Sequence, residues 1–264
     1  MESIEPLQEI KDKKRFYKAL KAGMYKIGNI LELLVFLAIW VMIFSSSDSI
    51  GGFTRAEIIT YIIFGNSIGL ISGYFLHRVI IREAYQKKSG LLVYRPFKYF
   101  KNVLLRGMLK SALPFFLVLI FHLAILYFFL NDFVFNYNPG YWLLIVLMII
   151  LAFITEFLMV YIVSLYSHWV IEAGDLQKIM LRIKKFLAGN YFPLSILPIG
   201  FLQISLFLPF AYSFFVPTEL FLKKITINEG WRGIFIQIAW IIILYIFIKS
   251  AWKRKRYQEI EVEK

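Results

Sequence analysis

The chain has 264 residues, of which 59% are hydrophobic and 19% aromatic, and its formal net charge is nevertheless +13. Soluble domains have about 45–50% apolar residues, so this composition excludes a soluble domain and a nucleic-acid-binding protein. A mean hydropathy of +0.67 with a basic excess is typical of a polytopic membrane protein whose basic residues lie in particular loops. The chain has no cysteine, which excludes disulfides, thiolate metal sites and cysteine nucleophiles.

Five apolar segments are predicted to be membrane-spanning helices, because a bilayer core about 30 Å thick needs about 20 apolar residues per span. In chain order they are Ile30–Phe44 (short, but extendable to Ile27), Ile58–Ile80, Ser111–Leu130, Tyr141–Tyr166 and Ile234–Ile248. The stretch between the fourth and fifth segments opens with a charged segment and continues as an apolar run that four prolines interrupt. Since backbone without hydrogen-bond partners cannot face lipid, these prolines predict short, broken helices packed against protein.

The distribution of lysine and arginine predicts the topology. Three segments hold 22 of the 30 basic residues: the N-terminal stretch to Asn29, the loop from His77 to Ser111, and the tail from Lys249. The positive-inside rule places all three in the cytoplasm, together with both termini. Termini on one side require an even number of spans, so we expect six, with the sixth hidden near Trp169–Ser195.

The charged segment Glu172–Leu187 is predicted to form an amphipathic helix, and its location in the membrane has two interpretations. Its charged face carries Asp175, Lys178, Arg182 and Lys185, and the opposite face is apolar. It is either an interfacial helix with its basic residues in lipid headgroups, or the missing span with its charges toward a water-filled or inter-subunit cavity. The second interpretation makes these four residues candidates for lining a pathway. The N-terminal segment 1–29 is likewise either an interfacial amphipathic helix or a solvated basic tail.

Few residues point to catalysis. No phosphate-binding loop is present, and the scattered histidines have no metal-ligand spacing, so neither a nucleotide site nor a metal site is expected. Glu156 lies within a predicted span, where a carboxylate must be protonated, paired or facing a cavity, and His122 is one candidate partner. An intramembrane enzyme using these two residues is an alternative function, and a membrane scaffold is another. Gly65, Gly69 and Gly73 predict close helix packing, within one chain or between two.

Three stretches of sequence, in this order, resemble a known family. The first is Ile50-Gly-Gly-Phe-Thr54 with Glu57, and the second runs from Ile81-Arg82 through Ser89-Gly90-Leu-Leu to Arg95-Pro96. The third includes Gly189, Pro193, Pro198, Leu208-Pro209-Phe210 and Pro217-Thr-Glu219. Together they are similar to the permease subunits of ABC-2 type ABC transporters.

The resemblance implies an all-α, six-span permease that forms one transmembrane domain over residues 1–264, in the cell (inner) membrane. It implies an outer re-entrant region at 190–217, marked by Gly189 and the prolines Pro193, Pro198, Pro209 and Pro217. It places Glu172–Gly189 as the fifth span and 249–264 as a cytoplasmic tail. That span is usually apolar, so Lys178, Arg182, Lys184 and Lys185 imply either a polar pathway or pairing with carboxylates of a partner.

The loop 81–103 is implied to carry a coupling helix that contacts an ATPase, through Arg82, Glu83, Tyr85, Lys87, Lys88 and Gly90. The residues fit a short polar helix that ends at Gly90, although taken alone they equally fit a basic loop that sets orientation. The chain is then not an enzyme and holds no cofactor, since ATP and Mg would bind in two partner ATPase subunits. Other implied partners are membrane lipids and a second permease, identical or distinct, but no nucleic acid. The expected activity is export of a lipid-like, peptide or drug-like substrate.

Overall fold

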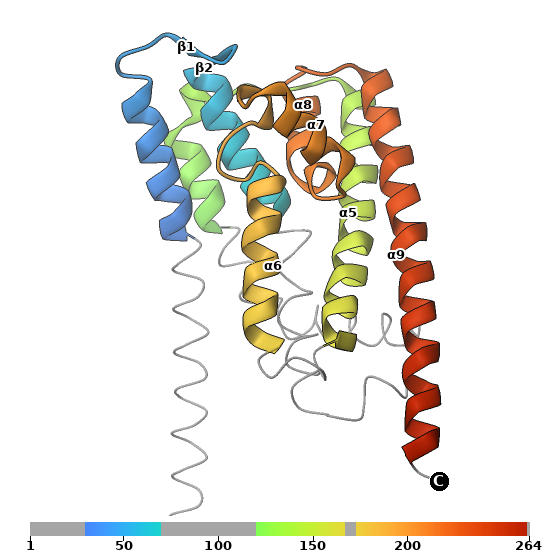
Figure 1. Ribbon diagram of the computed structural model, residues 1–264. Coiled ribbons are helices and arrows are strands. Elements are labelled where there is room, and N and C mark those ends of the chain that lie inside the picture. Colours follow the sequence, from blue (N-terminus) through green and yellow to red (C-terminus); the bar gives the residue numbers. More distant parts are fainter. Residues whose placement is uncertain (1–29, 70–119, 167–172, 263–264) are drawn as a thin grey trace, which may run out of the picture.

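The computed structural model describes residues 30–69, 120–166 and 173–262, and within these ranges the chain is mostly helical (Figure 1). A helix at Ile30–Ile43 leads into a small antiparallel hairpin of β1 (Ser49–Ile50) and β2 (Phe53–Thr54). Ile50 pairs with Phe53 in this hairpin, and a second helix follows over 55–69. This second helix begins with a capping box, because the Thr54 N–H donates to Glu57 Oε2 at 2.8 Å and the Glu57 N–H donates to Thr54 Oγ1 at 3.3 Å.

The second part of the described chain opens with a helix over 120–128. The elements that follow are the 3₁₀ turn η1 (Leu130–Asp132), the helices α5 (Pro139–Tyr166) and α6 (Ala173–Leu187), the 3₁₀ turn η2 (Leu194–Ile196), the helix α7 (Ile199–Phe207), the 3₁₀ turn η3 (Ala211–Ser213), and the helices α8 (Phe215–Phe221) and α9 (Ile227–Val262). This helical architecture agrees with the predicted all-α class. The six-span count stays a prediction, since segments 1–29 and 70–119 lie outside the described residues.

Within the described residues, two helices are long and apolar enough to cross a membrane: α5 over Pro139–Ile162 and α9 over Ile227–Ser250. The α9 segment is only 22% buried, and its exposed side chains include Phe235, Ile242 and Ile246. A long helix that exposes an apolar surface of this kind is expected to face lipid rather than water.

Helices α5 and α9 stand side by side, while α6 lies beside α5 with the short elements from η2 to α8 above its C-terminal end (Figure 1). Buried Gln237 of α9 donates to the Tyr212 carbonyl oxygen at 3.0 Å and to the Met148 carbonyl oxygen at 3.3 Å, which ties α9 to both η3 and α5. The neighbouring core is aromatic. Tyr61, a fully buried residue of the helix over 55–69, packs edge-on against Phe214 with ring centroids 5.7 Å apart.

Gly65 allows this close packing. A Cβ added at Gly65 would lie 2.6 Å from Cε1 and 3.0 Å from Cε2 of the buried Phe214 ring. The predicted role of Gly65 in close packing is therefore confirmed, and the contact is made inside one chain. Gly69, one turn further along, leaves 3.9 Å to the same ring.

Replacing Gly65 with alanine is expected to lower the free energy of unfolding by about 1–3 kcal/mol, because the new methyl group must displace a buried ring. Gly69→Ala is the matched control on the same helix and should be neutral or up to about 1 kcal/mol stabilising, since alanine favours a helix over glycine. Unfolding of both variants in detergent micelles measures the difference. Equal stability of the two variants would contradict the packing role of Gly65.

Candidate functional site

Two adjacent lysines near the C-terminal end of α6 form ion pairs with two different helices. Lys184 pairs with Glu156 of α5, whose side chain is 1% exposed. Lys185 donates to both carboxylate oxygens of Glu32 in the first helix, each at 2.7 Å. The sequence suggested a polar pathway or the carboxylates of a partner chain; in the structure these two lysines pair with carboxylates of the same chain, and the role of Lys185 in lining a pathway stays a prediction.

The other residues of the predicted charged face are Arg182, Asp175 and Lys178, and only the side chain of Arg182 is described. Arg182 is exposed, whereas the side chains of Asp175 and Lys178 lie outside the described residues, although their backbone belongs to α6. His122 is buried at 5% exposure in the helix over 120–128. The coupling residues Arg82, Glu83, Tyr85, Lys87, Lys88 and Gly90 also lie outside the described residues, so their role stays a prediction.

Glu32 was missed by the sequence analysis, although the sequence carries a signal for it. It is the only charged residue in the apolar run Ile30–Phe44. An isolated carboxylate in such a run has the same need for a partner as Glu156. The identity of the partner could not be read from the sequence, because Glu32 and Lys185 are 153 positions apart.

Gly189 lies two residues after the end of α6, in a backbone conformation that only glycine adopts without strain. Its φ is +80°, and its carbonyl oxygen accepts a 2.7 Å hydrogen bond from the buried Tyr61 hydroxyl. The neighbouring Ala188 carbonyl accepts from the Phe215 N–H at 3.1 Å. These bonds fix the end of α6 to the second helix and to α8.

The four prolines of the predicted re-entrant region lie at positions where a helix does not need a backbone N–H. Pro193 and Pro198 directly precede η2 and α7, Pro209 follows the end of α7, and Pro217 lies in the first turn of α8. The expectation of short, broken helices is confirmed, whereas their expected packing against protein is only partial at α7. Because α7 has nine residues and exposes Ile199, Ile204 and Phe207, its apolar surface suits lipid although the helix is too short to span it.

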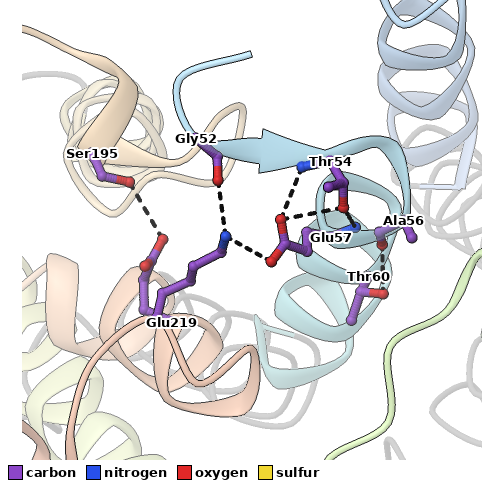
Figure 2. A network of polar contacts seen from close by, with 8 residues as sticks. Gly52, Thr54, Ala56, Glu57, Thr60, Ser195 and Glu219 are labelled. Atoms are coloured by element: carbon purple, nitrogen blue, oxygen red, sulfur yellow. Dashed lines mark hydrogen bonds and ion pairs between the residues drawn. The ribbon is translucent and has the colours of Figure 1, made fainter. Parts of the chain in front are cut away.

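Lys224 connects the hairpin to the end of α8. Its ammonium group lies 2.6 Å from Glu57 Oε1, donates to the Gly52 carbonyl at 2.9 Å, and stands 4.8 Å from the centre of the Phe53 ring. The chain reaches this position because Lys223, two residues after the end of α8, adopts a left-handed conformation with φ +57°. In Figure 2 the Gly52 carbonyl and the Glu57 carboxylate face one another, and Thr54 bonds to the second oxygen of that carboxylate.

Glu219 lies beside this cluster at the hairpin end of the molecule, where the Ser195 hydroxyl donates to it at 3.4 Å (Figure 2). Its side chain is buried, and this burial raises its pKa to about 7, against the opposing effect of the Lys224 charge. The hairpin, η2 and α8 therefore meet around two carboxylates and one lysine. The sequence placed Glu57 and Glu219 in separate motifs and did not identify Lys224.

The raised pKa of Glu219 predicts how stability depends on pH. Between about pH 4.5 and pH 7 the folded state binds more protons at this carboxyl than the unfolded state, so its contribution to stability falls as pH rises through this window. Glu219→Gln removes the titration and is expected to raise stability at pH 8 by about 3 kcal/mol, with little change at pH 4.5. Thermal unfolding at both pH values tests this, and parallel pH profiles for the variant and the parent chain would contradict it.

A family model described as ABC-2 family transporter protein matches residues 30–258, which run from the first helix into the last residues of α9. No curated protein and no solved structure matches the chain.

Proposed function

The chain belongs to the ABC-2 transporter family, and we propose that it is the permease subunit of an ATP-driven exporter whose ATP is hydrolysed in separate subunits. The family match confirms the resemblance found in the three sequence stretches. It makes the chain a membrane component of a transport system rather than an enzyme in its own right. Members of this family typically work with ATPase subunits.

The observation that carries the proposal is that α6 is followed at its C-terminal end by a series of short elements rather than by a second long helix. With 15 residues, α6 extends about 22 Å, which is less than the bilayer core of about 30 Å. The elements from η2 to α8 lie above its C-terminal end (Figure 1). We interpret the region 190–217, which holds η2, α7 and η3, as the re-entrant outer part of a crossing whose inner part is α6.

Such a divided crossing suits alternating access, because its two parts can open separately. The outer part is attached to the hairpin through Lys224 and Glu57, and the inner part is attached to α5 and the first helix through Lys184 and Lys185. These ion pairs can break and reform during a transport cycle. The structure thus suits a state closed at the hairpin end.

The pathway in this proposal follows the charged side of α6, with Asp175, Lys178 and Lys185 as lining residues. Arg182, the fourth residue of the predicted stripe, lies on an exposed face, so we place it at the lipid-facing border of the pathway. One permease supplies half of a pathway, and the complex would contain two permeases, identical or distinct, and two ATPases. The substrate is expected to be lipid-like, peptide or drug-like.

The coupling step is assigned to the loop 81–103, with Arg82 and Glu83 at the ATPase contact. Movement of the ATPases on ATP binding would push on this loop and shift the spans that it joins. The proposed orientation places this loop and both termini in the cytoplasm and the hairpin outside, since most basic residues lie in those segments.

The proposal is tested by affinity purification of the full-length tagged chain from its native membranes in mild detergent. An ABC-type ATPase should co-purify, and the purified complex should hydrolyse ATP. Charge reversal at Arg82→Glu with Glu83→Lys should reduce the recovered ATPase at least several-fold. Arg55→Glu, at the hairpin end, is the matched control and should not. Recovery of the intact chain without any ATPase would overturn the proposal.

A further inference from the structure

The outward side of α6 carries one cation in an apolar stripe. Ile179, Arg182, Ile183 and Phe186 are all exposed, and their spacing places them on one face of the helix. The three apolar side chains expose 53%, 51% and 41% of their surface. This face is distinct from the side through which Lys184 contacts Glu156.

Among the basic residues of α6 whose side chains the structure describes, Arg182 is the one without a described ion-pair partner. Lys184 and Lys185 have Glu156 and Glu32 as partners, and within the described residues no carboxylate forms an ion pair with Arg182. A guanidinium group is always charged and presents a planar fork of donors that fits a phosphate group. This face is therefore complementary to a ligand that carries an anionic group next to apolar groups.

The depth of Arg182 follows from the Lys184–Glu156 pair. Glu156 lies about 8 Å from the middle of the apolar window Pro139–Ile162, toward the Tyr166 end of α5. Arg182 is two residues before Lys184 on α6, about 3 Å nearer the same end. With a core half-thickness of about 15 Å, its Cα lies about 4 Å inside the interface, so its long side chain can reach the headgroup layer.

A second apolar face adjoins this one. The Lys185–Glu32 pair, with both side chains about one-third exposed, joins α6 to the first helix. Lys185 is one turn from Arg182, and Glu32 is one turn from Val35 on a helix whose outward residues Leu31, Leu34, Val35 and Ile39 are exposed. The cation thus lies between two apolar helix faces.

We propose that this surface binds the phosphate headgroup of an anionic phospholipid through Arg182, with its acyl chains along Ile179, Ile183 and Phe186 and along the outward face of the first helix. One cation flanked by two apolar strips is complementary to one phosphate with two acyl chains. A symmetrical dimer built on this face is disfavoured, because it would bring the two Arg182 side chains together without a counter-charge. The site depends on membrane embedding of α6 and not on ATP-driven transport.

The test uses the absence of native cysteine, which allows a single fluorescent label. Full-length Ile179→Cys carrying bimane is reconstituted into phosphatidylcholine vesicles containing either brominated phosphatidylglycerol or brominated phosphatidylcholine. The anionic lipid should quench with roughly fivefold higher apparent affinity, as expected for one interfacial charge. Arg182→Gln should reduce this ratio to about 1, and Arg182→Lys should keep most of it.

The control label is Ile243→Cys on α9, where the native side chain is also 53% exposed and lies about 7 Å from the middle of its apolar window, deeper than Ile179. Its ratio should be near 1 and should not respond to Arg182→Gln, and a single monodisperse peak in gel filtration would show that this variant folds. Equal quenching of the Ile179 label by both lipids would overturn the proposal, as would shielding from both, which indicates a protein partner. Loss of the ratio on adding inorganic phosphate would overturn it in favour of a soluble anion.

Discussion

Lys184→Met is expected to lower the free energy of unfolding by about 3–5 kcal/mol, because it leaves the Glu156 carboxylate buried without its ion-pair partner. Lys185→Met is the matched control, since the neighbouring lysine pairs with Glu32 at about one-third exposure. A partly exposed pair contributes at most about 1 kcal/mol. The two variants remove the same charge from adjacent positions and differ mainly in the burial of the partner.

The double variant Lys184→Met with Glu156→Leu should recover most of the loss, because replacing both members of a buried pair with apolar groups is often neutral. Thermal unfolding in detergent, or titration with a denaturing detergent, measures all four proteins. If Lys184→Met and Lys185→Met lower the free energy of unfolding by the same small amount, the buried pair contributes no more to stability than the partly exposed one.

Gly189→Ala is expected to cost about 3 kcal/mol, through two effects that can be separated. A positive φ costs a non-glycine residue about 1–2 kcal/mol. A Cβ at this position would also lie 2.7 Å from the Tyr61 hydroxyl and 3.0 Å from Leu194 Cγ, which disturbs the hydrogen bond that fixes the end of α6.

Gly52→Ala isolates the first effect, because Gly52 has the same φ of +80° and nothing lies within 4 Å of its added Cβ. It should lose only about 1–2 kcal/mol. Tyr61→Phe isolates the hydrogen bond, and its cost should be about 1–3 kcal/mol, since the hydroxyl and the Gly189 carbonyl are buried together. Equal losses in Gly189→Ala and Gly52→Ala would mean that crowding at Tyr61 is unimportant.

Local features of this protein were predictable because they depend on residues close together in the chain. The apolar windows of α5 and α9, the helix at Ala173–Leu187 and the proline-bounded elements after it all follow from composition, periodicity and the missing N–H of proline. The role of Gly65 in close packing was predictable from its spacing, but its partner ring, Phe214, was not.

The contacts of the charged segment Glu172–Leu187 could not be predicted from its sequence. Its amphipathic pattern was clear, yet the pattern could not distinguish lysines that line a cavity from lysines held by carboxylates elsewhere in the chain. Lys184 and Lys185 project in different directions from adjacent positions and contact different helices. Which direction meets a carboxylate depends on how α5 and the first helix pack against α6.

The sequence by itself determined that this chain is a basic, helical membrane protein of the ABC-2 type, because apolar windows, basic segments and ordered short motifs are local properties. Only the tertiary structure decided which charges are neutralised: Lys184 by Glu156, Lys185 by Glu32 and Lys224 by Glu57. It also left Arg182 on an exposed apolar face. The physical reason is that an ion pair forms only when packing brings two distant segments within a few ångströms, and no local pattern encodes that contact.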